Sequence, residues 1–109
     1  MFTISDNDIE LTRGDTAIIK FELYDTQGNL VDLSDFEGKL VFTVKSSVYS
    51  DTATIQKPIV NGVLRLEPGD TEELSYGKFV YDVQLRLPNG YTDTVIQPHV
   101  FKLLSEVTF

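Results

Sequence analysis

The sequence predicts an all-β domain made of two packed layers of antiparallel strands. Three features indicate this class: apolar and polar side chains alternate with a period of two, Asn-Gly pairs separate β-rich runs, and no long stretch has a helical period. The clearest example lies between Tyr76 and Ile96, where an alternating run is followed by Asn89-Gly90 and a second β-rich run. Because Asn-Gly is the strongest short signal for a tight hairpin, these two runs should be neighbouring strands.

Five further extended segments are expected before residue 46. Short strands are expected at residues 2–5 and 9–12, and a longer one at residues 18–24. Turn chemistry follows at residues 25–29, where Gly28 is able to take a positive φ, and a short extended piece follows at residues 30–33. Leu40, Phe42 and Val44 then mark the buried side of the next strand.

The middle of the chain predicts an edge strand and a second hairpin. Residues 52–57 read as the edge strand, because Pro58 just after them removes a hydrogen-bond donor from the ladder. Asn61-Gly62 then predicts a tight turn into a strand at residues 63–66.

The second half of the chain predicts a helical turn and a break in the last strand. Residues 68–75 are expected to form one helical turn that Asp70 caps. Pro98 should interrupt the chain, so that residues 99–108 resume as a separate last strand, and the break suits a strand that bends or changes sheets. These elements give about eight strands with turns every eight to twelve residues, which favours a two-layer sandwich.

Length and composition predict one domain over residues 1–109 with a real hydrophobic core, since 41% of the residues are hydrophobic. No run of about eighteen apolar residues indicates a membrane span. The N-terminus has neither the basic start nor the long apolar segment of a secretion signal, so synthesis in a cytoplasm is expected. The absence of cysteine excludes disulfides and thiolate metal sites.

The net charge of −8 argues against two classes of partner. Nucleic-acid binding requires clustered Lys and Arg around the phosphates, but the nine basic residues here are scattered and outnumbered by seventeen acidic ones. An anionic membrane surface is disfavoured for the same reason, so we expect neither nucleic acid nor membrane as a partner.

The order of these signals resembles the immunoglobulin-like domains of tailed-phage structural proteins, especially the N-terminal domain of baseplate upper proteins. The residues that carry the resemblance include Ile9–Thr16, Phe21–Asp25, Leu40–Lys45, Gly62–Leu66, Gly77–Leu85 and the Asn89-Gly90 turn before Thr94-Val95. The resemblance implies an immunoglobulin-like antiparallel β-sandwich of about seven to nine strands. It also implies a non-enzymatic structural or adaptor role in the virion of a tailed phage or prophage, in the baseplate, tail or head accessory proteins.

One tripeptide and three acidic clusters are interpreted as structural rather than chemical. Arg13-Gly14-Asp15, an integrin-binding tripeptide in other contexts, lies between two predicted strands, where Gly14 and Asp15 are good turn formers. The acidic cluster at residues 6–10 lacks the glycine and distal Glu of a calcium loop. This cluster and those at residues 32–37 and 70–73 are expected to be solvated loops, which are common in an acidic protein.

His99 is the only histidine, and no serine stands in a nucleophile-elbow sequence. A packed or surface histidine beside Pro98 is therefore expected. We predict no catalytic residues, no cofactor and no metal site, and hence no enzyme.

Tyrosines near strand ends offer an alternative function. Tyr24, Tyr49, Tyr76 and Tyr91 lie in or near predicted loops, where their rings could stack on sugars. A carbohydrate- or cell-surface-binding module, with Tyr49 and Tyr91 in its ligand loops, is thus the alternative to the virion role. Tyr81 belongs to the core face and could be a corner tyrosine that bonds back to the preceding loop.

Apolar termini suggest subunit contacts, because disordered tails are usually polar. The interface residues proposed at the two ends are Phe2, Ile4, Ser105, Val107 and Phe109. Ile18, Val41 and Val80, on nominally outward faces, suggest a second and flatter contact. The expected partners are copies of this chain and other virion proteins, reached by strand addition and by symmetric repetition of weak contacts. Deleting residues 105–109 is expected to abolish assembly and leave a folded monomer.

Overall fold

The computed structural model of the chain describes residues 2–5, 7–24, 27–32 and 39–105. Within these residues β-structure dominates, which confirms the all-β prediction. The elements are β1 (Phe2–Ser5), β2 (Asp8–Thr12), β3 (Ala17–Lys20), β4 (Leu40–Lys45), β5 (Ile55–Ile59), β6 (Val63–Leu66), α1 (Pro68–Thr71), β7 (Gly77–Arg86) and β8 (Thr92–Leu104).

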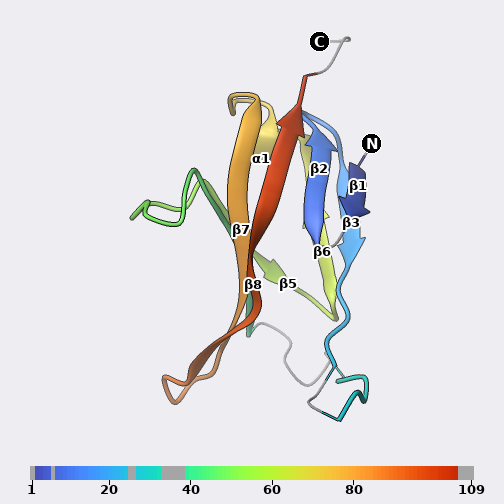
Figure 1. Cartoon of the computed structure of the whole chain (residues 1–109), viewed down its shortest axis with the longest axis vertical. Coiled ribbons are helices and arrows are strands. Elements are labelled where there is room, and N and C mark those ends of the chain that lie inside the picture. Colours follow the sequence, from blue (N-terminus) through green and yellow to red (C-terminus); the bar gives the residue numbers. More distant parts are fainter. Residues whose placement is uncertain (1, 6, 25–26, 33–38, 106–109) are drawn as a thin grey trace.

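The strands form two sheets. Six of them lie in the order β1-β2-β8-β7-β4-β5, and β3 pairs with β6 in a separate sheet (Figure 1). Neighbours are antiparallel except β2 and β8, which run parallel from Ile9 opposite Phe101 to Thr12 opposite Leu104. The expectation of a wholly antiparallel arrangement is therefore wrong for this pair. Most of the chain separates β2 from β8, so no hairpin fixes their relative direction.

The buried side chains of both sheets form one hydrophobic core. Phe42 lies at its centre, with ring centroids 5.2 Å from Tyr81, 6.1 Å from Phe101 and 6.4 Å from Phe21. The period-two pattern decides which side chains enter the core: in β4, Leu40, Phe42 and Val44 are buried. The other members of the core are Ile9, Leu11, Ala17, Ile19, Ile55, Ile59, Leu64, Leu66, Tyr81, Val83, Phe101 and Leu103.

Both Asn-Gly turns are confirmed. Asn61 and Gly62 have φ values of 51° and 76°, and Val60 and Val63 exchange backbone hydrogen bonds of 3.0 and 2.9 Å across them. At the second turn the Gly90 N–H donates to the Leu87 carbonyl at 3.0 Å, and β7 and β8 pair antiparallel around it. The first turn also carries the chain from the large sheet, which contains β5, to the small one, which contains β6.

The strand expected over residues 18–24 is shorter than predicted. β3 ends at Lys20, opposite Val63, because β6 has no residue left to pair beyond that point. The chain then forms an isolated bridge between Tyr24 and Leu30. The backbone N–H of Val31 donates to the Leu23 carbonyl at 2.8 Å. Gly28 has the expected positive φ, 84°.

Pro58 lies inside an edge strand rather than after one. β5 covers Ile55–Ile59 instead of residues 52–57, and it is the terminal strand of the six-stranded sheet, as predicted. Pro58 stands opposite Val41 of β4. An edge strand tolerates proline because half of its N–H groups point away from the ladder.

Asp70 stabilises the start of α1 from inside the helix. The N-cap residue is Glu67, and Asp70 occupies the third helical position, where its Oδ2 accepts the Glu67 backbone N–H at 2.7 Å. The prediction that Asp70 is the N-cap is therefore wrong. The helix begins at Pro68 as predicted, and proline is favourable at this first position because it has no N–H to satisfy there. It ends at Thr71, earlier than the predicted residue 75.

The chain does not break at Pro98. β8 continues through it from Thr92 to Leu104 and stays in one sheet, so the separate last strand expected from residue 99 is wrong. An irregularity in the pairing accommodates the proline. Between the pairs Tyr81–His99 and Val83–Ile96, β7 advances two positions and β8 three, which leaves one extra residue on β8. Such bulges accommodate a residue that lacks an N–H. Residues 106–108 of the prediction lie outside the described part of the chain.

Candidate functional site

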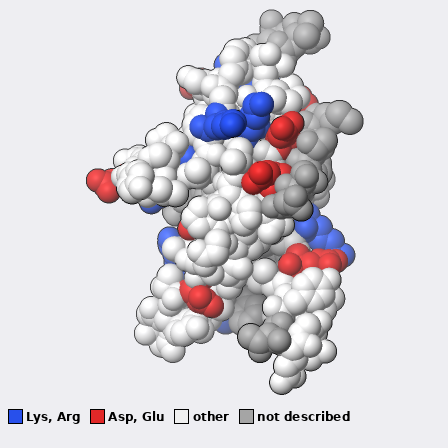
Figure 2. All heavy atoms as spheres, viewed as in Figure 1, with Lys and Arg blue, Asp and Glu red and all other residues white. Residues whose placement is uncertain are grey.

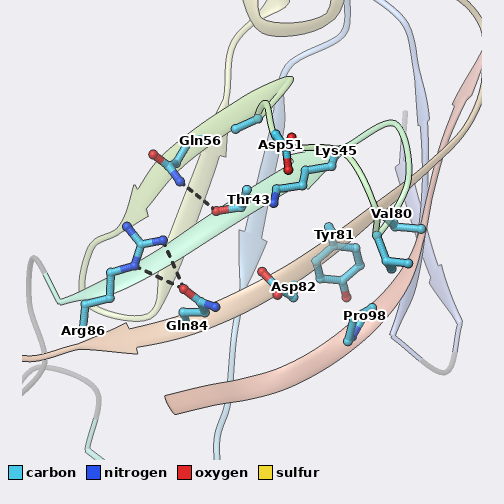
Figure 3. A pocket seen from close by; sticks show the side chains of 12 residues that line it. Thr43, Lys45, Asp51, Gln56, Val80, Tyr81, Asp82, Gln84, Arg86 and Pro98 are labelled. Atoms are coloured by element: carbon cyan, nitrogen blue, oxygen red, sulfur yellow. Dashed lines mark hydrogen bonds between the residues drawn. The ribbon is translucent and has the colours of Figure 1, made fainter. Parts of the chain in front are cut away.

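A groove of about 410 Å³ lies on the outer face of the six-stranded sheet. Its floor comes from β4, β5, β7 and β8, and the connection between β4 and β5 forms one wall (Figure 3). The residues that line it are Thr43, Lys45, Val48, Asp51, Ala53, Gln56, Val80, Tyr81, Asp82, Gln84, Arg86 and Pro98.

Strand register builds a polar row across the floor. Thr43 alternates with the core residues Phe42 and Val44 and so faces the outer side of the sheet, where its neighbours leave it 8% exposed. It stands opposite Gln56 of β5 and Asp82 of β7. These three side chains lie on neighbouring strands, so the row places one polar group about every 4.8 Å. Figure 3 shows Gln56, Thr43, Gln84 and Arg86 toward one end of the groove and Val80 and Pro98 toward the other.

Hydrogen bonds between side chains hold the polar end in place. The Gln56 Nε2 donates to the Thr43 Oγ1 at 3.1 Å. The Arg86 guanidinium donates twice to the Gln84 Oε1, from Nε at 3.2 Å and from Nη2 at 3.1 Å. Because these groups are already oriented, a ligand that binds them loses less side-chain entropy.

Both signs of charge line the groove, with Lys45 and Arg86 matched by Asp51 and Asp82. Burial raises the pKa of the Asp82 carboxyl above its ordinary value, while the charges of Lys45 and Arg86 lower it; burial is the larger influence. A lining with two cations and two anions favours a ligand without net charge.

A second feature is the outer edge of β8. β2 pairs with β8 only from Phe101 to Leu104, and the Asp8 Oδ1 accepts the Val100 N–H at 3.0 Å just beyond that ladder. Within the described ranges, no strand pairs with this edge of β8 from Thr92 to His99.

Apolar side chains lie beside that edge. Leu23 and Val95 line two adjoining hollows of about 380 and 350 Å³ between residues 20–24 and β8. Phe21, Leu23, Leu85, Val95 and Ile96 are only partly buried. We call this region the open end; it combines unpaired backbone with exposed apolar surface, the two requirements for strand addition.

Tyr81 anchors the sheet from its core face. Its ring is 2% exposed, and its hydroxyl donates to the backbone carbonyl of Asn7, in the turn between β1 and β2. The partner is therefore that distant turn and not the preceding loop, which corrects the expectation for a corner tyrosine. Burial, reinforced by the charge of Asp8, raises the pKa of Tyr81 to about 12.

Arg13-Gly14-Asp15 forms a turn. The Asp15 N–H donates to the Thr12 carbonyl at 3.1 Å, and Gly14 has a φ of 83°. The Gly14 N–H donates to the Oγ1 of the buried Thr71 at 2.9 Å, and Arg13 donates to the Leu74 carbonyl and lies 4.3 Å from the centre of the Tyr76 ring. The tripeptide thus fastens α1 to the end of β2.

The acidic residues and His99, also considered from the sequence, do not form a common site among the described residues. Asp70 is engaged in the α1 cap and in an ion pair with Lys57 at 2.6 Å, whereas Asp6, Asp35 and Glu37 lie outside the described residues. His99 is opposite Tyr81, with ring centroids 6.2 Å apart. Across residues 2–5, 7–24, 27–32 and 39–105, no three His, Cys, Asp or Glu side chains gather as metal ligands. No helix there has the length and apolar character to cross a membrane.

The two tyrosines proposed for ligand loops are both exposed but separate. Tyr49 is 91% exposed in the β4–β5 connection, and Tyr91 is 55% exposed after the β7–β8 turn. These two loops occupy different parts of the molecule in Figure 1. The structure therefore does not bring Tyr49 and Tyr91 together.

The proposed interface residues also fall in different places. Val41 and Val80 lie on the outer face of the six-stranded sheet, whereas Ile18, 54% exposed, lies on the outer face of β3. Because the two sheets share a core, these faces are on opposite sides of the molecule. Ser105 is exposed after β8, Phe2 and Ile4 belong to β1, of which only the backbone is described, and Val107 and Phe109 lie outside the described residues.

Sequence reasoning missed the groove. The alternation pattern already places Thr43, Gln56, Asp82 and Gln84 on outward faces, and this was the available signal. The alternation pattern does not show that β4 pairs with both β5 and β7, and this pairing is what sets these side chains in one row.

Comparison with known proteins adds no relative: no family model, no curated protein and no solved structure matches this chain.

Proposed function

We propose that this chain is a non-enzymatic structural or adaptor component of a tailed-phage or prophage virion, built as an immunoglobulin-like sandwich. Strand order supports the fold. The sequence β8-β7-β4-β5 in one sheet, against β3-β6, corresponds to strands G, F, C and C′ packed against B and E in a variable-type immunoglobulin domain. The virion role rests on the resemblance of the sequence, and its location is baseplate, tail or head accessory.

The open end carries the assembly part of the proposal. No described strand pairs with the outer edge of β8 from Thr92 to His99, so this edge offers donors and acceptors to an incoming strand. Leu23, Val95 and Ile96 beside it offer apolar contacts to every second side chain of that strand. The partners are copies of this chain and other virion proteins, and repetition of many weak contacts stabilises the particle.

The experiment is sedimentation analysis of the purified chain and of two valine-to-lysine variants. Val95→Lys places a charge beside Leu23 in the two hollows next to β8 and should leave a folded monomer where the unaltered chain self-associates. The matched control, Val60→Lys, alters a valine that is 44% exposed near the β5–β6 turn and should leave association unchanged. Equal association of all three proteins contradicts an assembly contact at the open end.

The virion role has its own test. An antibody against the purified chain should label regularly repeated positions on phage particles released from the source strain, seen by electron microscopy. Labelled particles that lack repetition contradict a symmetric role, and unlabelled particles contradict a virion role. Removal of residues 105–109 separates the two proposed contacts: a folded monomer assigns assembly to this segment, and unchanged association assigns it to the open end.

A further inference from the structure

We propose that the groove on the outer face of the six-stranded sheet binds a neutral, linear oligosaccharide lying across β5, β4 and β7. The inference is independent of the virion role. It also differs from a sugar site at the loop tyrosines, because the residues that carry it are on the face of the sheet.

The spacing of polar groups favours a repeating ligand. Gln56, Thr43 and Asp82 occupy consecutive strands, so hydrogen-bonding groups recur at about the 4.8 Å distance between strands. This is close to the length of one sugar ring. A linear glycan that crosses the strands therefore meets one polar side chain per residue.

The chemistry of these groups suits hydroxyls. The row combines an amide, a hydroxyl and a carboxylate, and Arg86 and Gln84 next to it add fixed donors and an acceptor. A sugar hydroxyl both donates and accepts, so it can use the donors and acceptors that remain after the Gln56–Thr43 and Arg86–Gln84 hydrogen bonds.

The charge and shape of the groove narrow the class of ligand further. Two cations and two anions in the lining give no preference for a charged ligand. Val80 and Pro98 at the other end supply the apolar surface on which the C–H face of a sugar ring packs. A groove of about 410 Å³ is within the range of small-molecule sites and leaves both ends of a longer chain outside.

Affinity at a single groove should be weak. Among the described residues, Tyr81 is the only aromatic that lines the groove, and its ring packs on the core face, where it contacts Phe42. Without a stacking platform, we expect dissociation constants of about 1 mM, which binding to a surface with many copies would strengthen.

The test is titration of the ¹⁵N-labelled chain with cellohexaose, maltohexaose and the hexamer of N-acetylglucosamine, followed by NMR. Hexagalacturonate serves as the anionic counterpart. At least one neutral hexamer should shift the backbone resonances of Thr43, Asp82 and Gln84 in a saturable way, and hexagalacturonate should bind more weakly.

Two variants and a control assign the site. Asp82→Asn and Gln84→Ala should each weaken binding of that hexamer by about tenfold, because each removes a hydrogen bond to the ligand. Lys78→Ala, on the outer face of the same strand but outside the groove, should leave it unchanged. Circular dichroism checks that all three remain folded.

Four outcomes overturn the proposal: none of the neutral hexamers shifts these resonances, hexagalacturonate binds more tightly than all of them, the shifts map to Tyr49 or Tyr91 instead, or Lys78→Ala loses as much affinity as the groove variants.

Discussion

The two ends of the β7–β8 ladder share strands but differ in how well they are covered. At one end, β2 pairs with β8, and Ile9, Leu11, Phe101 and Leu103 are each at most 1% exposed. We call this the closed end; α1 lies there, tied to the end of β2 through Gly14 and Thr71 (Figure 1). At the open end, no described strand extends the sheet beyond β8, and the apolar side chains are only partly buried.

The difference shows that the same pattern of alternation leads to unequal burial at the two ends. Leu85 and Leu103 both occupy inward positions of the same sheet, yet only Leu103 is sealed from water. Burial of apolar surface at the closed end therefore supplies stability, whereas the partly exposed apolar side chains at the open end contribute less to it.

The outer face offers a further contrast. Figure 2 shows Lys and Arg close to Asp and Glu on the face it presents, in keeping with the cross-strand partners Glu10 and Lys102. Charge is thus mixed across the sheet instead of gathered in one patch, although the chain as a whole has a net charge of −8.

The largest expected effect comes from the same substitution at the two ends. Leu103→Ala should lower the free energy of unfolding by about 3 kcal/mol, because it leaves a cavity in a sealed core. Leu85→Ala should cost only about 1 kcal/mol, because its side chain is partly exposed before the change. Urea denaturation measures both, and equal losses would show that the two ends are equally closed.

The second largest effect on stability is expected from the hydrogen bond between Gly14, after β2, and Thr71 of α1. Thr71→Val removes the hydroxyl that accepts the Gly14 N–H, and because Thr71 is fully buried the loss should be about 1–2 kcal/mol. Thr92→Val, at an exposed position of β8, is the matched control and should change stability by less than about 0.5 kcal/mol. If both variants unfold at the same urea concentration, the link does not stabilise the closed end.

Tyr81 tests the anchor between the sheet and the β1–β2 turn. Tyr81→Phe should cost about 1 kcal/mol at neutral pH, since the Asn7 carbonyl loses its donor. The raised pKa gives a second signature: the folded state resists ionisation of the phenol, so the unaltered protein loses stability as pH rises from the ordinary value of 10.0 toward about 12. The variant should lose less over the same range, and parallel losses would show that ionisation of Tyr81 does not drive the transition.

The smallest effect is expected on the outer face. Burial raises the pKa of Asp82, so its protonated form favours folding, and that contribution is lost as pH rises from the ordinary value of 3.8 through the raised one. The stability of Asp82→Asn minus that of the unaltered protein should therefore be slightly larger at neutral pH than at pH values below 3.8. Thermal melts at the two pH values give the comparison, and an opposite sign would mean that Lys45 and Arg86 outweigh burial.

Much of the fold was predictable because it depends on neighbours in the sequence. Alternation in Leu40–Val44 and in Phe79–Leu85, and the turns at Asn61-Gly62 and Asn89-Gly90, require only local backbone preference and burial on one side. The continuation of β8 through Pro98 was not predictable in this way. A bulge depends on the partner strand, and the sequence around Pro98 does not show that β7 lies opposite.

The sequence by itself determined that the chain is all-β, where its tight turns lie and which side chains of each strand face the core. Only the tertiary structure decided that β2 joins β8 in parallel along part of one edge, with no other described strand on that edge, and that Gln56, Thr43 and Asp82 form one row. The physical reason is that alternation is a property of one strand, whereas pairing between distant strands is settled by packing of the whole core.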